Sequence, residues 1–578
     1  MIRILVLALL APGLCAAQPA SQRLERLAAE ATERWLDLFP VSEAFSRGAG
    51  PRQDRFELVY SAEHRERQRA YHQWVLREVE AIASSELNAS EKLTHALLAY
   101  RARDSLESLA LPFHQHSAFI HIGNGLAFGW VRLANRQPLR SEADFRAWMR
   151  RLARYPAHLE DVQRVMRDGM EAKITVPRVV AERTLAQLQA LAPEDTAKSA
   201  LWNPVTRLPA APQADYRQLL REEIFPAIRK LAAFVRNEYL PQARSSDGFG
   251  ALPGGERMYR YAVRHETTTD LTPHEIHELG LKEVKRIQAR FLAAGRQAGF
   301  QGRPSELRAW LRERPSNYPF HSPEEVIAYL KRIHARIEPQ LPKLFARMPK
   351  ARFEIQLTDP ALAASAPAQY YSPTDDGGAG IFAMPVTDAR QVSTFGLAAL
   401  LAHEGMPGHH FEIGFRLENP LPEFRRRGSY TAYSEGWGLY AESLGHELGL
   451  YQEPLELMGR YSYELFRAGR LVVDTGLHAK GWTREQAIRY LVEECGSSQA
   501  GATNEILRYM VLPGQALAYK IGELAILELR AKAEKRLGPG FDIRAFHQAV
   551  LEEGPLPLSM LRQRVEAWID AQSPQRKP

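Results

Sequence analysis

The chain has 578 residues, of which 75 are Lys or Arg and 68 are Asp or Glu, so its formal net charge is +7. Because 45% of the residues are apolar, the composition excludes a disordered or fibrous protein. The positive excess is small for this length, and no basic stretch alternates with aromatic residues, so nucleic-acid binding is not expected. The length allows several domains or one large catalytic domain.

Residues 1–17 have the order of a secretory signal peptide, with an apolar run at 4–14 and a cleavage site expected after Ala17. We therefore expect a soluble protein in the periplasm or outside the cell. No later segment approaches the ~20 apolar residues of a membrane-spanning helix. Lipid anchoring at Cys15 is the alternative, although a bulky Leu precedes this residue. Cleavage leaves Cys495 alone, and we expect it to be an inert buried thiol.

The segment 18–245 is predicted to form an N-terminal helical lobe. Apolar residues recur three and four apart between charged ones, as in 141–170. Two stretches rich in Pro, Gly and Ser, 203–212 and 240–255, interrupt this pattern. The second is predicted to separate this lobe from a catalytic lobe at 246–578.

The second half of the chain is also predicted to be mostly helical. Thr272, Pro273 and Glu275 form the capping box of a long helix. Strand-like alternation occurs only at 353–357 and 380–384. The predicted fold class is therefore mainly α, with a small β-sheet just before the most informative segment of the chain.

That segment contains four ionisable side chains close together. A helix of mostly small apolar residues ends in His403 and Glu404, and such groups are rarely buried unless they are paired or bind a metal. Two further imidazoles, His409 and His410, follow within a turn or two. The arrangement indicates a metal site with a carboxylate beside it.

The spacing of the histidines departs from a regular zinc helix, where two histidines stand four apart on one face. On a straight helix, His409 would lie about 120° away from His403, and His410 about 10 Å further along the axis. Because Pro407 lacks an N–H and Gly408 tolerates unusual dihedrals, we expect the helix to bulge. If the bulge absorbs two residues, His409 takes the place of the second histidine in an H-E-x-G-H helix, with the Glu as general base.

A catalytic zinc site also needs a third protein ligand and an open position for water. Glu435 is the candidate, because it lies 26 residues after His409, enough for a loop and an antiparallel helix. Glu442 and His446 fall on the same helical face as Glu435. They either support a ligand from behind or belong to an exposed face.

The run from His403 to His410 resembles the H-E-x-x-P-G-H-H signature of the bacterial family called domain of unknown function 885 (DUF885). Further segments match this family in order through the second half of the chain: 271–280, 435–437, 473–478, 508–509 and 513–522. The family is similar to helical zinc peptidases of the thimet-oligopeptidase and thermostable-carboxypeptidase kind. This resemblance implies two helical lobes around a cleft.

The resemblance also implies the roles of individual residues. His403, His409 and Glu435 would bind one zinc ion and Glu404 would be the base, with His410 as the alternative second ligand. The donor that stabilises the oxyanion would be Tyr519, or otherwise Tyr509 or His478, all in matching segments. Arg508 and Lys520 are candidates to hold a substrate carboxylate.

These features predict a zinc-dependent hydrolase, and a peptidase of short peptides in particular, because a cleft between lobes excludes folded proteins. The strand near Ile381 is a candidate to pair with an extended substrate. Two alternatives remain open: a zinc hydrolase of a non-peptide amide or ester, and a non-catalytic binding protein on the same scaffold. Glu404 argues against the second, because a purely structural site has no use for a base beside the metal.

Overall fold

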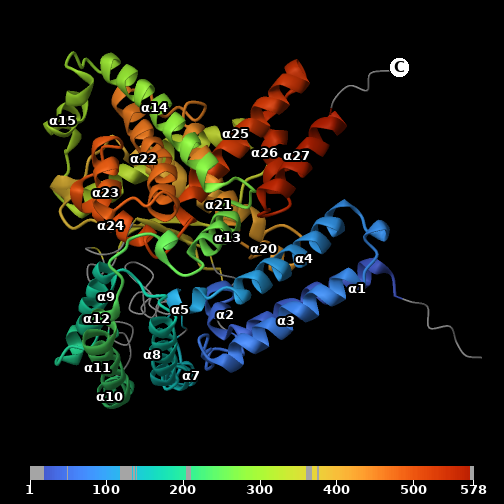
Figure 1. Cartoon of the computed structure of the whole chain (residues 1–578). Helices are drawn as coiled ribbons and strands as arrows, with labels where there is room; N and C mark the ends of the chain where they lie inside the picture. The colour runs from blue at the N-terminus through green and yellow to red at the C-terminus, as the bar shows by residue number, and fades with distance from the viewer. Residues whose placement is uncertain are drawn as a thin grey trace, which may run out of the picture.

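The computed structural model describes most of the chain, namely residues 18–48, 50–117, 133, 137, 139–202, 210–358, 363, 368–373 and 377–572. The protein is mainly α-helical with one small sheet, as predicted from the sequence. Figure 1 shows the helices of the two halves of the chain on different sides of the molecule. The predicted signal peptide, residues 1–17, lies outside the described residues.

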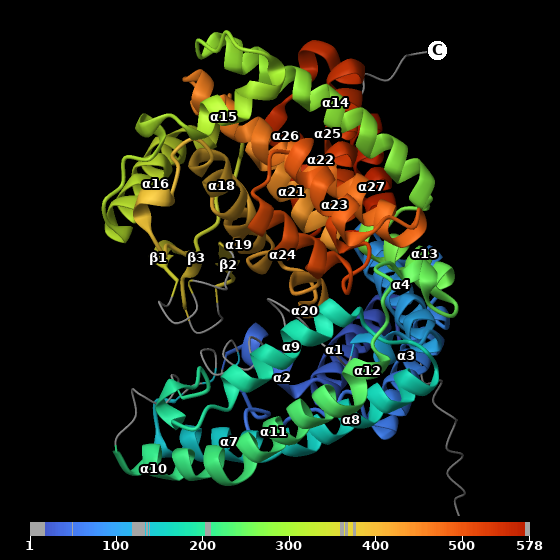
Figure 2. The same cartoon turned by 60° about the vertical axis from the view of Figure 1, so that its left-hand side comes forward.

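The helices before residue 245 form two packed groups (Figures 1 and 2). Helices α1, α3 and α4 contact one another, and α11 packs on α8 and α9. The stretch 141–170, whose spacing predicted helical structure, forms two helices that are separated at residues 153–154. The bounds are α1 (Ala20–Leu38), α2 (Pro40–Ser46), α3 (Ala62–Glu80), α4 (Ala89–Ala110), α5 (Phe113–Ser117), α7 (Glu142–Leu152), α8 (Tyr155–Glu171), α9 (Arg178–Leu191), α10 (Ala210–Leu219), α11 (Phe225–Phe234) and α12 (Leu240–Gln242).

The later helices are built around two long contacts, α14 with α22 and α21 with α25. Helix α14 begins at the predicted capping box, where the Thr272 hydroxyl accepts the N–H of Glu275 and the Glu275 carboxylate accepts the N–H of Thr272. The bounds are α13 (Gly255–Thr267), α14 (Pro273–Gln297), α15 (Leu307–Arg312), α16 (Pro323–Ile337), α18 (Leu397–Glu404), α19 (His409–Leu417), α20 (Glu423–Arg426), α21 (Thr431–Ser443), α22 (Pro454–Ala479), α23 (Arg484–Glu493), α24 (Gln499–Tyr509), α25 (Ala518–Leu537), α26 (Ile543–Leu551) and α27 (Leu558–Gln572).

Two of the hydrophobic cores cross the boundary expected near residue 245. One core joins Trp148 and Tyr216 to Val472 of α22. Another joins Leu97 of α4 to Trp437 of α21. The two halves are therefore held together by shared apolar packing, and their division into an N-terminal and a catalytic lobe stays a prediction.

The sheet has three strands, β1 (Phe353–Leu357), β2 (Gln369–Tyr371) and β3 (Gly380–Met384), in the order β1-β3-β2. The sequence pattern predicted β1 and β3, whereas β2 is too short to show alternation. Strand β3 pairs in parallel with β1 and antiparallel with β2. The expectation that the strand near Ile381 pairs with a substrate is therefore wrong, because both edges of β3 are already hydrogen-bonded.

Within the part of the chain that the structure describes, no helix has both the length and the apolar character needed to cross a bilayer. Cys495 is buried, and burial raises the pKa of its thiol to about 12. This agrees with the expected inert thiol, because the reactive form of cysteine is the thiolate.

Candidate metal centre

Helices α18 and α19 meet at the motif that the sequence indicated. Helix α18 ends at Glu404 and α19 begins at His409, so residues 405–408 interrupt the helix completely. The expected bulge is therefore a break between two helices. Gly408 is required in this break, because a Cβ atom on it would lie 1.9 Å from the carbonyl oxygen of His403.

Helix α21 packs against this break and brings Glu435 to the two histidines. The indole N–H of Trp437 donates to the carbonyl oxygen of Pro407 over 2.9 Å, which ties α21 to the break. A Cβ atom on Gly438 would lie 2.8 Å from the ring of His403. The close approach of α21 to the imidazole therefore depends on the absence of a side chain at this position.

Three donor atoms converge at this place. The Nε2 atoms of His403 and of His409 each lie 3.4 Å from Oε2 of Glu435, and the three donors lie within 4.8 Å of one another. Tetrahedral ligands bound about 2.1 Å from a zinc ion lie about 3.4 Å apart, so the spacing fits one ion. The site opens on one side, because the His409 and Glu435 side chains are 13% and 22% exposed, while His403 is 2% exposed.

Glu442 fixes the ring of His403 from behind. Its Oε1 lies 2.9 Å from Nδ1 of His403, and both side chains are buried. A carboxylate can only accept this hydrogen bond, so Nδ1 carries the proton and Nε2 is left for a metal. The sequence left two alternatives for Glu442, support of a ligand or an exposed helix face. The buried contact with His403 agrees with the first. His446, in contrast, packs its ring against that of Tyr451.

His410, the alternative second ligand, faces the sheet. Its Nδ1 lies 2.9 Å from the Tyr370 hydroxyl on β2, and its Nε2 lies 3.1 Å from the carbonyl oxygen of Ala351. Burial lowers the pKa of His410 to about 4, so the ring is neutral near pH 7. Both ring nitrogens are engaged, and His410 connects α19 to the sheet.

The charges of the site are strongly coupled. Burial alone would lower the pKa of His403, but hydrogen bonds to Glu435 and Glu442 raise it to about 9. Burial alone would raise the pKa of Glu435, but hydrogen bonds to the two imidazoles hold it well below its ordinary range. Burial raises the pKa of Glu404, against the opposing effect of both imidazoles. The site therefore attracts positive charge. We refer to His403, Glu404, His409, Glu435 and Glu442 as the metal cluster.

The three predicted oxyanion donors are placed differently. The ring of Tyr519 stacks on that of His403 with centroids 6.4 Å apart. The Tyr509 hydroxyl donates to Glu505 over 2.5 Å. His478 accepts from a main-chain N–H through Nδ1 and donates to the Tyr509 carbonyl through Nε2. The structure thus brings Tyr519 to the metal cluster, whereas Tyr509 and His478 are engaged in internal hydrogen bonds.

Lys520 does not reach a substrate, and that expectation is wrong. Its Nζ is fully buried and lies 2.8 Å from Glu464, 2.6 Å from Glu523 and 3.3 Å from Glu283. Arg508 is paired with Glu505. The Lys520 cluster is defined as Glu283, Arg286, Arg460, Glu464, Lys520 and Glu523.

Two arginines of α22 escaped the sequence analysis. Nη2 of Arg467 lies 3.9 Å from Oε1 of Glu442. The guanidinium of Arg470 lies 4.4 Å from the ring centroid of Tyr519 and pairs with Glu505. The signal available in the sequence was two arginines within an otherwise apolar stretch. Such a stretch is expected to be buried, and buried charges need partners.

Proteins of known structure resemble this chain over nearly its whole length. The crystal structure of a candidate lipoprotein from Colwellia psychrerythraea has 28% sequence identity and a TM-score of 0.87, covering 96% of this chain and 100% of that chain. A second candidate lipoprotein, from Shewanella oneidensis, has 18% identity and a TM-score of 0.72, covering 95% and 99%. A carboxypeptidase from Pyrococcus furiosus has 12% identity and a TM-score of 0.39, covering 96% and 99%. Among curated protein sequences, none matches.

A family of bacterial proteins of unknown function matches residues 42–565. The matched span contains all five residues of the metal cluster as well as Tyr519. It also contains most of the N-terminal helices, so the match is not confined to a motif. The chain therefore belongs to the DUF885 family.

Proposed function

We propose that this protein is a zinc-dependent hydrolase that cleaves short peptides. The observation that carries the proposal is the convergence of His403, His409 and Glu435 at the separations expected for ligands of one ion. Two histidines and a glutamate are a known ligand set of catalytic zinc in peptidases. The partial exposure of His409 and Glu435 leaves an open side for water and substrate.

The roles of the protein side chains follow from their positions. A zinc ion held by the three ligands would supply a Lewis acid and lower the pKa of water at this site. Glu404 accepts the proton of the attacking water and passes it to the leaving amine. The Tyr519 hydroxyl donates a hydrogen bond to the carbonyl oxygen that becomes negative. Arg470, stacked on Tyr519, adds positive charge beside that oxygen.

We also propose that the protein acts outside the cytoplasm. The order of residues 1–17 supports export, and the described residues contain no helix suited to span a bilayer. The related structures from Colwellia and Shewanella are candidate lipoproteins, which is consistent with this location.

The variant Glu404→Gln tests the catalytic part of the proposal. Because the amide cannot accept the proton, hydrolysis of a mixed peptide library should fall by about 10²- to 10⁴-fold while one zinc per chain is retained. Mass spectrometry of the products and elemental analysis of the protein measure the two quantities. Glu418→Gln, at the exposed end of α19, is the control and should hydrolyse as the wild type does.

Two results would contradict the proposal. One is a wild-type protein without stoichiometric metal, and the other is full metal with unchanged hydrolysis in Glu404→Gln. Either result would favour a binding protein on the same scaffold.

A further inference from the structure

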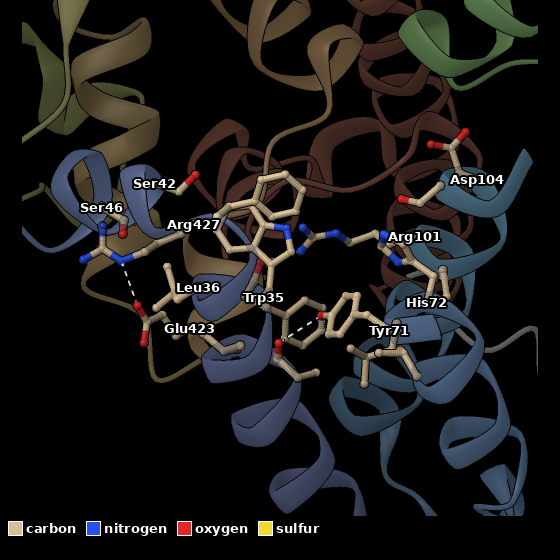
Figure 3. Close-up of a pocket in the computed structure, with 18 of the residues that line it drawn as sticks. Trp35, Leu36, Ser42, Ser46, Tyr71, His72, Arg101, Asp104, Glu423 and Arg427 are labelled. Atoms are coloured by element: carbon tan, nitrogen blue, oxygen red, sulfur yellow. Dashed lines mark hydrogen bonds and ion pairs between the residues drawn. The ribbon is translucent and has the colours of Figure 1, made fainter. Parts of the chain in front are cut away.

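A cavity of about 530 Å³ lies between the N-terminal helices and the helix that carries His409. Helices α1 to α4 supply one side, and α13, α19 and α20 supply the other. Its apolar wall contains Trp35, Leu36 and Tyr71 (Figure 3). Phe424 also lines it. The volume falls within the about 300–1,000 Å³ of typical small-molecule sites, and such sites combine an apolar lining with a few placed polar groups.

Arg101 of α4 is the polar group that distinguishes this cavity. Its guanidinium reaches toward Trp35 (Figure 3). It donates to the main-chain carbonyl of Phe424 over 3.3 Å and lies 5.8 Å from the ring centroid of Phe424. Among the residues that the structure describes, no carboxylate forms an ion pair with Arg101. A cation without an acidic partner, set in an apolar wall, is suited to bind an anion.

The two acids that line the cavity already have partners. Asp104 lies 2.8 Å from Nδ1 of His265. Glu423 binds Arg47 at 2.7 Å and Arg427 at 3.3 Å. Neither carboxylate forms an ion pair with Arg101, and the three arginines that line the cavity (Arg101, Arg416 and Arg427) outnumber its two acids.

The cavity adjoins the metal cluster through α19. Ile413, Arg416 and Leu417 line the cavity and follow His409 by four, seven and eight residues, which places them on the same helical face. At about 1.5 Å per residue, Ile413 is about 6 Å and Leu417 about 12 Å from His409 along the axis. An extended peptide spans such distances with about two to four residues, at about 3.3 Å each.

Helix α13 makes a second connection between the two sites. His265 lines the cavity, and the next residue, Glu266, is close enough to Glu435 for the two charges to interact. The cavity and the metal cluster are therefore neighbours on both α13 and α19.

We propose that this cavity binds the carboxyl-terminal end of a peptide substrate, with its free carboxylate on Arg101 and a large apolar side chain against Trp35 and Tyr71. This inference rests on the proposed peptidase function and specifies its substrate class. The substrates are short peptides with an apolar carboxyl-terminal residue. The bond that is cleaved lies on the amino-terminal side of that end, toward His409.

Binding can be measured apart from hydrolysis in full-length, zinc-loaded protein with the Glu404→Gln change. The probes are a hexapeptide ending in Phe, as the free acid and as the carboxyl-terminal amide, titrated by isothermal calorimetry. The acid should bind about tenfold to a hundredfold more tightly, because a charged hydrogen-bonded pair is lost in the amide. Adding Arg101→Gln should abolish the difference.

Two further variants serve as controls. Arg103→Gln lies two residues further along α4, where the arginine is exposed and pairs with Glu80, and it should keep the full preference for the acid. Arg101→Lys keeps the charge and should keep most of the preference, while thermal unfolding shows whether each variant is folded. If Arg101→Lys keeps the preference for the acid that Arg101→Gln loses, the effect comes from the charge at this position and not from misfolding.

Several outcomes would overturn the assignment of the cavity. These are equal affinity for acid and amide, a preference that survives Arg101→Gln, and binding of 3-phenylpropanoate without binding of the peptide, which would indicate a free organic acid. An Arg101-dependent preference in a protein that hydrolyses no peptide would support the cavity as a peptide site and reject only the hydrolase.

Discussion

Two clusters of buried charge lie in the second half of the chain, and they differ in their balance. In the Lys520 cluster, three carboxylates face three cations: Glu283, Glu464 and Glu523 against Arg286, Arg460 and Lys520. In the metal cluster, three carboxylates face one cation: Glu404, Glu435 and Glu442 against Arg467. The remaining members of the metal cluster are imidazoles, which are neutral when they bind a metal.

This difference indicates which cluster the fold completes by itself. Buried charges are costly unless they are paired and hydrogen-bonded. The Lys520 cluster meets that requirement with its own side chains. With both imidazoles neutral, as metal binding requires, the metal cluster lacks two positive charges, which is the charge of one zinc ion. We infer that the first cluster stabilises the fold and that the second is built to bind a ligand.

The largest effect that separates the clusters is expected from His409→Ala. Loss of one of three donors should reduce bound zinc from one per chain to nearly none and abolish hydrolysis, as measured by elemental analysis and peptide cleavage. The matched variant His410→Gln should keep its zinc. It should lose about 1–3 kcal/mol of stability, because it breaks the contacts with Tyr370 and Ala351. Zinc lost from His410→Gln but kept by His409→Ala would reverse the ligand assignment.

The next largest effect concerns stability rather than metal. Lys520→Met should lower the free energy of unfolding in urea by about 3–5 kcal/mol, because it leaves buried carboxylates without their cation. Zinc content should not change. Lys532→Met removes a half-exposed ion pair with Glu566 and should cost less than about 1 kcal/mol. Loss of zinc in Lys520→Met would show that the two clusters are not independent.

A smaller effect is expected at the residue that orients His403. Glu442→Gln should weaken zinc binding by about 10- to 100-fold, because the amide holds the ring less firmly and lowers its basicity. Hydrolysis at saturating zinc should largely remain. Competition with a chelator of known affinity measures the change. Glu447→Gln, which contacts Arg530 at the surface, is the control, and equal affinities in both variants would reject the role of Glu442.

The last effect concerns Asp474, a buried acid. Asp474 accepts hydrogen bonds from the Tyr259 hydroxyl and the Gly514 N–H, and no ion pair among the described residues includes it. Burial raises its pKa from the ordinary 3.8 to about 7. Between these values the native state binds more protons than the unfolded state, so this residue makes the protein less stable as pH rises toward 7.

Asp474→Asn removes this titration. The stability of the Asn variant relative to the wild type should therefore increase by about 1–3 kcal/mol from pH 5 to pH 8. Urea unfolding at both pH values measures it. Asp570→Asn, at an exposed site, should show no such trend. A relative stability that does not change with pH would mean that Asp474 is ionised in the folded protein.

Features that depend on neighbouring residues in the chain were predictable from the sequence. The capping box at Thr272 and the strands at 353–357 and 380–384 were identified because their signals are local. Pro407 and Gly408 correctly indicated an interruption between His403 and His409. Its form, a complete break rather than a bulge, depends on packing against Trp437, which lies far along the chain.

Contacts between distant elements were not predictable in the same way. Glu442 lies on a helical face that is equally compatible with solvent, and only the approach of α21 to α18 places it on His403. Lys520 lies in a family-matching segment, yet the crossing of α25 with α22 and α14 buries it among carboxylates. Strand β2 was missed because three residues carry no periodic signal.

Anomalous diffraction at the zinc absorption edge, from crystals of the zinc-loaded protein, tests the central claim most directly. The account predicts one peak per chain, about 2.0–2.2 Å from Nε2 of His403, Nε2 of His409 and a carboxylate oxygen of Glu435. A zinc peak bound by His410 instead of His409, or no peak between these three side chains, would contradict it.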